Sequence, residues 1–199
     1  MHLFFSTPIW VSDIDNYQEI NTELEKFIYI EKNKDPHGSI KSNVKGWHSK
    51  QFDLHNKSLE KFLTSIKPKI EGAILDMGWD IQNQIVKITS MWSIVNKKDS
   101  FNERHHHGNS DLSAAYYVCA DEDSGDIVFY DPRQSFMFSH PEAEKINDLN
   151  AQVKSISPKS GRLVLFPSYL DHSVQPSKSN NDRIVISFNI TLIPKRYLK

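Results

Sequence analysis

The chain has 199 residues, a length that fits one domain with a sizeable core. Its 24 basic and 25 acidic residues give a net charge of −1, which argues against binding to nucleic acid or to an anionic membrane surface. The single cysteine, Cys119, excludes an intramolecular disulfide framework and any multi-cysteine metal site. With no basic leader and no long apolar run, we expect a cytoplasmic protein.

The first 80 residues carry one strand signal and two helix signals. Residues 3–11 are apolar and aromatic and include Pro8, which favours an edge strand because proline cannot donate to a central ladder. Apolar residues at helical spacing predict one helix over 16–31 and a second over 58–77. Pro68 is expected to kink or divide the second helix.

The rest of the chain is rich in strand signals. Short runs of β-branched, aromatic and other apolar residues predict strands over 81–95, 112–119, 126–130, 152–157, 162–166 and 183–193. Two helices followed by many strands favour an α+β fold, with the helices packed outside an antiparallel sandwich or barrel.

Histidines gather next to two of these strands. His105, His106 and His107 precede the strand over 112–119, and His172 follows the strand over 162–166. Alternation along an extended chain places His105 and His107 on one face and His106 on the other. Imidazole is a common ligand of iron and other transition metals, and two histidines with a carboxylate leave metal positions open for a chelating co-substrate and dioxygen.

Arg183 opens the strand that follows His172. If this strand returns antiparallel past His172, the guanidinium enters the barrel near the metal, where it can clamp a carboxylate through two hydrogen bonds. A dicarboxylate co-substrate fits both anchors, with one end on the metal and the other on Arg183.

Several segments together resemble the 2-oxoglutarate and Fe(II)-dependent oxygenases, and among them a branch of small bacterial and phage proteins related to the prolyl hydroxylases. The core segments are Trp92–Asn96, His105–His107, Leu112–Tyr117, Phe129–Arg133, Leu165–Ser168, His172–Pro176 and Arg183–Asn189. Leu3–Pro8 and Gly46–Ser49 resemble N-terminal motifs of the same branch. The resemblance covers nearly the whole chain and rests on the order and spacing of the segments.

The resemblance implies a fold and an activity. The fold is a double-stranded β-helix, also called a jelly roll and similar to cupins, in a single domain over 1–199. Residues 1–80 would supply the outer strand and helices, and residues 81–199 the jelly-roll core. The activity is the hydroxylation of an amino-acid, peptidyl or small-metabolite substrate, with release of succinate and CO2.

The resemblance also implies site residues. Fe(II) would be bound by His105, His107 and His172. The 2-oxoglutarate co-substrate would be bound by the iron and Arg183, with Tyr117 and Asn96 nearby.

One departure from the family pattern concerns the third metal ligand. Most of the superfamily has an acid two residues after the first histidine, but His107 stands there if His105 leads, and Asn109 if His107 leads. Asp111 is the nearest acid. The choice among His105, His107 and Asp111 stays open, and three neutral imidazoles would leave the iron more positive.

Other readings and smaller expectations remain. One alternative is a three-histidine, cupin-type dioxygenase that does not use 2-oxoglutarate, and another is a non-catalytic jelly-roll binding module. His48 is expected at the surface or in a loop, and Asp171 is expected to face water. A homodimer could form through the edge over 3–11.

Overall fold

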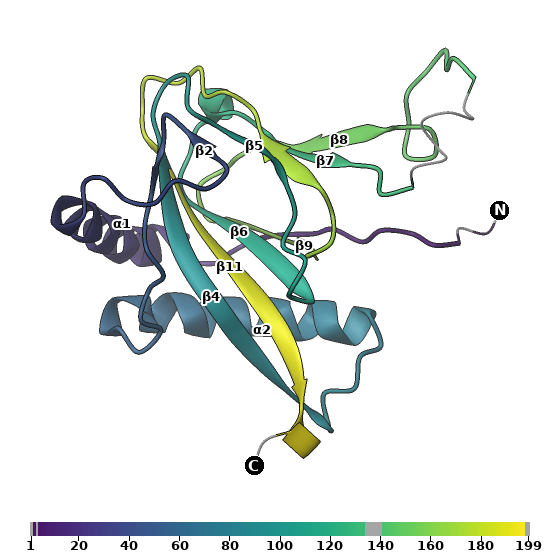
Figure 1. Cartoon of the computed structure of the whole chain (residues 1–199), viewed down its shortest axis with the longest axis horizontal. Helices are drawn as coiled ribbons and strands as arrows, with labels where there is room; N and C mark the ends of the chain where they lie inside the picture. The colour runs from purple at the N-terminus through teal and green to yellow at the C-terminus, as the bar shows by residue number, and fades with distance from the viewer. Residues whose placement is uncertain (1, 3, 134–140, 198–199) are drawn as a thin grey trace.

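Two antiparallel sheets form the body of the protein. The computed structural model describes residues 2, 4–133 and 141–197. The six-stranded sheet has the order β1 (Trp10–Asp13), β9 (Arg162–Pro167), β6 (Leu112–Cys119), β11 (Arg183–Pro194), β4 (Gln84–Asn96) and β3 (Trp47–His48). The five-stranded sheet has the order β2 (Asn43–Val44), β5 (Phe101–His105), β10 (His172–Val174), β7 (Ile127–Tyr130) and β8 (Val153–Ile156). Figure 1 shows the long strands β4 and β11 running side by side through the molecule.

Two helices cover the outer face of the six-stranded sheet (Figure 1). They are α1 (Tyr17–Lys34) and α2 (Glu60–Asp76); three short 3-10 helices, η1 (Lys57–Leu59), η2 (Glu122–Ser124) and η3 (Lys195–Tyr197), lie in the connections. The ring of Phe62 on α2 lies 4.7 Å from that of Tyr116 and 6.2 Å from that of Phe188. Burying one such side chain contributes about 2–3 kcal/mol, so this layer is the main source of stability.

Alternation along β11 separates the core from an inner cavity. Ile184, Ile186, Phe188 and Ile190 are fully buried and pack toward the helices. Arg183, Val185, Ser187 and Asn189 face the opposite way and line a cavity between the sheets. Because the side-chain period of a strand is two, one strand therefore supplies both the apolar core and a more polar cavity wall.

Most predicted elements are confirmed, with shifted ends. The α+β class is confirmed, and α2 continues through Pro68 without dividing. The first strand, expected over 3–11, begins only at Trp10; Leu3 lies outside the described residues. Four short strands, β2, β3, β5 and β10, were not expected from the sequence.

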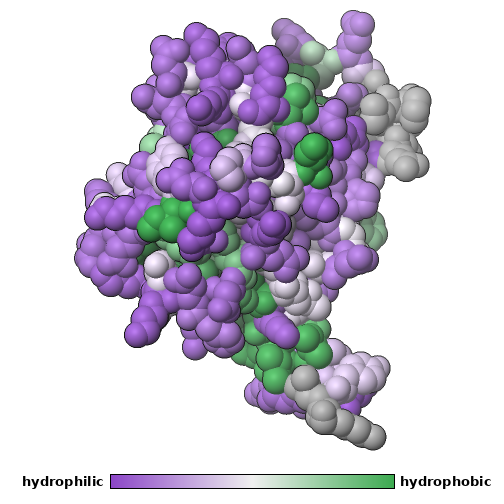
Figure 2. Space-filling view, turned by 60° about the vertical axis from the view of Figure 1, so that its left-hand side comes forward, coloured by the Kyte–Doolittle hydropathy of each residue, from purple (hydrophilic) through white to green (hydrophobic). Residues whose placement is uncertain are grey.

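The surface in Figure 2 is mostly hydrophilic, with apolar side chains gathered where β4 begins and β11 ends. Ile81, Ile85 and Val86 are exposed in this region. In the part of the chain that the structure describes, no helix combines the length and the apolar character needed to cross a bilayer.

Candidate active site

Three histidines converge from two neighbouring strands. His105 ends β5, His172 begins β10, and the two residues are paired across the five-stranded sheet. His107 follows two residues after His105, and one ring nitrogen from each of the three lies within 4.8 Å of the others. His106 turns outward, with its Nδ1 lying 3.2 Å from Asp171 Oδ1. The predicted alternation of the histidine run is therefore confirmed.

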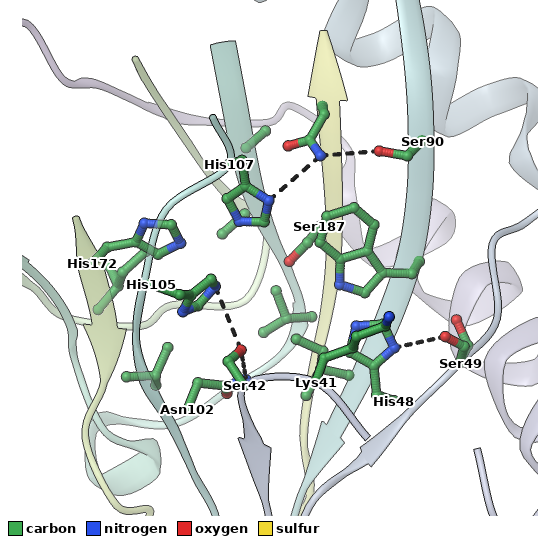
Figure 3. A pocket seen from close by; sticks show the side chains of 18 of the residues that line it. Lys41, Ser42, His48, Ser49, Ser90, Asn102, His105, His107, His172 and Ser187 are labelled. Atoms are coloured by element: carbon green, nitrogen blue, oxygen red, sulfur yellow. Dashed lines mark hydrogen bonds between the residues drawn. The ribbon is translucent and has the colours of Figure 1, made fainter. Parts of the chain in front are cut away.

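Hydrogen bonds fix the orientation of two of the rings. Nδ1 of His105 lies 2.7 Å from the carbonyl oxygen of Glu103, and Nδ1 of His172 lies 2.9 Å from that of Leu170. Since a carbonyl oxygen only accepts, each Nδ1 carries the proton and each Nε2 keeps its lone pair. Figure 3 shows His105, His107 and His172 grouped around one space.

Asn189 contacts the third ring. Its side-chain nitrogen lies 3.5 Å from His107 Nδ1 and donates to Ser90 Oγ at 3.0 Å, while its Oδ1 accepts from Ser113 Oγ at 2.8 Å. A half-turn of this amide exchanges oxygen and nitrogen at almost no change in shape. The oxygen would then accept from His107 Nδ1 and from Ser90, and the nitrogen would donate to Ser113. That arrangement leaves the Nε2 lone pair of His107 free for a metal.

Burial keeps all three histidines neutral. Loss of solvent, together with the neighbouring imidazoles, lowers the pKa of His172 to about 3 and that of His107 to about 4. The pKa of His105 is also lowered, chiefly by burial. Neutral imidazole is the form that binds a metal, so the cluster is ready to bind one at physiological pH.

Arg183 is a buried cation on the wall of the same cavity, which has a volume of about 640 Å³. The residue is 2% exposed, and Nη1 donates to the carbonyl oxygens of Ser124 and Gly125 at 3.2 and 3.1 Å. Its Nε has no hydrogen-bond partner, and no carboxylate forms an ion pair with it among residues 2, 4–133 and 141–197. Burial lowers the pKa of Arg183, yet a guanidinium stays charged, so this site lacks an anion.

The other two predicted co-substrate residues lie near Arg183 in different ways. Tyr117 lines the cavity, and burial raises the pKa of its phenol to about 12. Asn96 is paired with Arg183 across β4 and β11. Its Nδ2 donates to Oδ1 of Asn102, and Asn102 lines the cavity.

Gly46 lies against the side chain of Asn96. A Cβ on Gly46 would lie 2.0 Å from Asn96 Oδ1, so only glycine fits where the segment before β3 crosses Asn96.

The structure adds residues that sequence reasoning missed. His48, expected at the surface or in a loop, lies in β3, is 8% exposed and lines the cavity, so that expectation was wrong. Its ring stacks on Trp92 at 5.7 Å, and Trp92 stacks on His107 at 5.6 Å. Period-two counting along the Trp92–Asn96 segment identifies Trp92 as inward facing, but no sequence signal places His48 opposite it.

Two acids that are close to the histidines in the sequence have other partners. Asp111 Oδ2 accepts from the backbone nitrogen of Leu192 at 2.7 Å, and the cluster of ligating atoms found in the described residues does not include it. Asp171 is one-third exposed and binds Arg104, with side-chain atoms 2.6 Å apart. Asp171 therefore supports the outer face and not the ring of His172.

Comparison with known proteins identifies one family. Residues 90–189, half of the chain, match the model of the family described as "Putative 2OG-Fe(II) oxygenase". This range contains all three clustered histidines, Arg183 and Tyr117. No curated protein sequence matches the chain significantly.

Solved structures share the fold at low identity. A prolyl-4-hydroxylase from Pseudomonas putida is 13% identical with a TM-score of 0.63, covering 94% of this chain and 93% of that one. A prolyl hydroxylase from Trichoplax adhaerens, in complex with a peptide of hypoxia inducible factor, is 14% identical with a TM-score of 0.62, covering 96% and 86%. HygX from Streptomyces hygroscopicus, with nickel and 2-oxoglutarate bound, is 12% identical with a TM-score of 0.62, covering 93% and 82%. These likenesses confirm the predicted double-stranded β-helix.

Proposed function

Because this chain belongs to the family of 2-oxoglutarate and Fe(II)-dependent oxygenases, we propose that it hydroxylates a C–H bond of an amino-acid, peptidyl or other small substrate. In the balanced reaction, R–H, O2 and 2-oxoglutarate give R–OH, succinate and CO2. The observation that carries the proposal is the presence of a neutral three-histidine cluster and an unpaired buried arginine on one cavity.

The donor set fits Fe(II). His105, His107 and His172 would hold the ion through imidazole nitrogen, which suits iron in this oxidation state. All three histidines line the cavity, so an ion held by them would be accessible from the cavity to a chelating acid and dioxygen. No carboxylate belongs to the set among the described residues, so the metal keeps its full double positive charge.

The cavity also fits 2-oxoglutarate. The buried guanidinium of Arg183 lacks an anion, and a distal carboxylate would supply one through charge-assisted hydrogen bonds. Tyr117 donates no hydrogen bond to a protein group in the described part of the chain, so its hydroxyl is free for the same carboxylate. A 2-oxo acid with one carboxylate at each end therefore matches both anchors.

The chain's own residues orient the reactants and exclude water. When bound, Fe(II) and 2-oxoglutarate supply the oxidising chemistry. Arg183 and Tyr117 would fix the acid at one end of the cavity, while the three imidazoles fix the metal. The wall between them, built from Ala115, Val185 and Phe166, is apolar and keeps bulk water from the reacting centre.

The direct test needs no substrate. Metal-free protein is loaded with Fe(II) without oxygen and titrated with 2-oxoglutarate, and the visible charge-transfer band of a chelated keto acid is recorded. We expect a band in the wild-type protein and at least ~100-fold weaker 2-oxoglutarate binding in Arg183→Met, because a buried charge pair is lost. Absence of the band with iron bound would refute the proposal.

The three-histidine, cupin-type dioxygenase is the rival that the ligand set favours, since it also lacks a carboxylate ligand. In a cupin-type dioxygenase, Arg183 would have no 2-oxoglutarate to bind. Arg183→Met would then leave substrate oxidation intact, and succinate would not form. Measuring succinate and the Fe(II) charge-transfer band together separates the two enzymes.

A further inference from the structure

The cavity wall carries positive charge and no negative charge. Among the described residues that line it, none is aspartate or glutamate, whereas Lys41, Lys50 and Arg183 are cations. Lys50 is paired with Asp35 at 2.9 Å, and Arg183 is reserved for the co-substrate in the proposed function. Lys41 forms no ion pair with any described residue. Lys41 is an exposed residue, so its ammonium is accessible to a ligand that enters the cavity.

A second polar group on this wall also lacks a partner. The indole Nε1 of Trp92 is buried and has no hydrogen-bond acceptor among the described residues. An unsatisfied buried donor costs about 1–3 kcal/mol, which an oxygen acceptor on a ligand would recover. The indole is held between the rings of His48 and His107, at centroid distances of 5.7 and 5.6 Å, so the direction of its N–H is fixed.

These groups share one part of the cavity. Lys41 lies just before β2 and His48 belongs to β3, and both line the cavity. Figure 3 shows them on the side of Ser49, away from His172. His48 is buried and neutral, with its pKa lowered by loss of solvent and its Nδ1 2.7 Å from the carbonyl oxygen of Ser49. Its role here is to hold the indole, and it adds no negative charge.

We propose that the substrate presents an anionic group, a carboxylate or a phosphoryl group, to a subsite formed by Lys41 and the Trp92 indole N–H. The inference rests on the proposed function, because it assigns Arg183 to 2-oxoglutarate. The net charge of the site with Fe(II) and 2-oxoglutarate bound agrees with an anionic substrate group. Three neutral imidazoles leave two positive charges on the metal and Arg183 adds one, against two negative charges on 2-oxoglutarate. The loaded site keeps one positive charge, and Lys41 adds a second on the same cavity wall, so an anionic group of the substrate is attracted there.

The test measures binding and not turnover. Protein loaded with Zn(II) and 2-oxoglutarate is titrated calorimetrically with four probes of similar size: benzoate, phenyl phosphate, neutral benzamide and cationic benzylamine. We expect at least one of the two anions to bind about tenfold or more tightly than benzamide and benzylamine. Tighter binding of benzoate assigns a carboxylate substrate, and tighter binding of phenyl phosphate assigns a phosphoryl substrate.

Matched variants locate the anion. Lys41→Gln removes the free cation, Trp92→Phe removes the N–H and keeps an aromatic ring, and Lys50→Gln is the control because Lys50 already has a partner. The first two are expected to weaken anion binding about tenfold, and the third to leave it unchanged. Equal binding of all four probes, or an anion preference that survives both Lys41→Gln and Trp92→Phe, overturns the subsite.

The charge-transfer titration separates this inference from the proposed function. If the wild-type protein with Fe(II) and 2-oxoglutarate shows the band and no anion preference is found, the subsite is wrong and the oxygenase stands. If the band itself is absent, the proposed function fails first. Lys41→Gln should retain the band, since Lys41 has no described contact with the three histidines, Arg183 or Tyr117. Trp92 stacks on His107, so the band is recorded for Trp92→Phe before its anion binding is compared.

Discussion

The two faces of the six-stranded sheet are made by the same strands and have opposite compositions. Toward the helices, β11 and β6 present Ile186, Phe188 and Tyr116, all fully buried. Toward the cavity, the same strands present Arg183, Asn189 and Tyr117. The outer face stabilises the fold, and the inner face carries polar groups that line the cavity, among them Arg183, whose Nε has no hydrogen-bond partner in the described part of the chain. Neighbouring residues on one strand should therefore respond to mutation in different ways.

The largest contrast is expected between Phe188→Ala and Arg183→Met. Phe188 is fully buried under α2, so its truncation should lower the free energy of unfolding by about 3–5 kcal/mol. Arg183→Met removes a buried cation without an anion and should change stability by less than about 1 kcal/mol, while it abolishes tight 2-oxoglutarate binding. Urea unfolding checks both values. A strongly destabilised Arg183→Met would mean that this residue is structural.

The next effect concerns Asn189 and the ring of His107. Leucine at position 189 is similar in size but accepts no hydrogen bond, so Asn189→Leu should weaken Zn(II) or Fe(II) affinity about 10- to 100-fold. Asn189→Asp keeps an acceptor for His107 Nδ1 and should bind the metal at least as tightly as wild type.

Two further measurements distinguish positioning from folding in the Asn189 variants. The NMR resonance of the His107 Nδ1 proton in the Zn(II)-loaded protein should be protected from exchange in wild type and Asn189→Asp and lost in Asn189→Leu. A lower unfolding free energy of Asn189→Leu with unchanged metal affinity would contradict the positioning role. Ser90→Ala, which removes a contact of Asn189 but not of His107, is the matched control.

A pH effect on stability follows from the buried imidazoles in the metal-free protein. The folded-state pKa values of His172 and His107, about 3 and about 4, lie below the ordinary value of 6.5, so the unfolded chain binds more protons below pH 6.5. Stability is fully present above pH 6.5 and falls as the pH drops from there toward 4, by roughly 1 kcal/mol per pH unit for each histidine. Urea midpoints between pH 7.5 and 5 test this slope. His172→Asn should make the slope shallower, and an unchanged slope would contradict the assignment.

The sequence was informative wherever a local pattern decides the outcome. Helical spacing located α1 and α2 because one apolar face must pack, and period-two alternation separated His106 from its neighbours on the same short run. The strands with long apolar runs, such as β6 and β11, were located for the same reason.

The strands and site residues that could not be predicted from the sequence depend on contacts between distant segments. β10 has only three residues and contains His172, so its local pattern is too short to indicate a strand. His48 lies on a two-residue strand whose position is fixed by pairing with Ile94 of β4. Asn189 could be identified as inward facing by counting from Arg183, but its contact with His107 requires β11 and the end of β5 to meet in space.

The smallest expected effects come from the adjacent tyrosines of β6. Tyr116 donates its hydroxyl to Asn21 Oδ1 at 2.6 Å in the helix-facing core, so Tyr116→Phe should cost about 1–2 kcal/mol of stability and leave 2-oxoglutarate binding unchanged. Tyr117 has no such partner in the described part of the chain, so Tyr117→Phe should leave stability unchanged and weaken 2-oxoglutarate binding about five- to tenfold. Thermal unfolding and the charge-transfer titration measure the pair. If Tyr117→Phe destabilises the metal-free protein as much as Tyr116→Phe does, the inner face is held together like the outer one, and the division of roles along β6 is wrong.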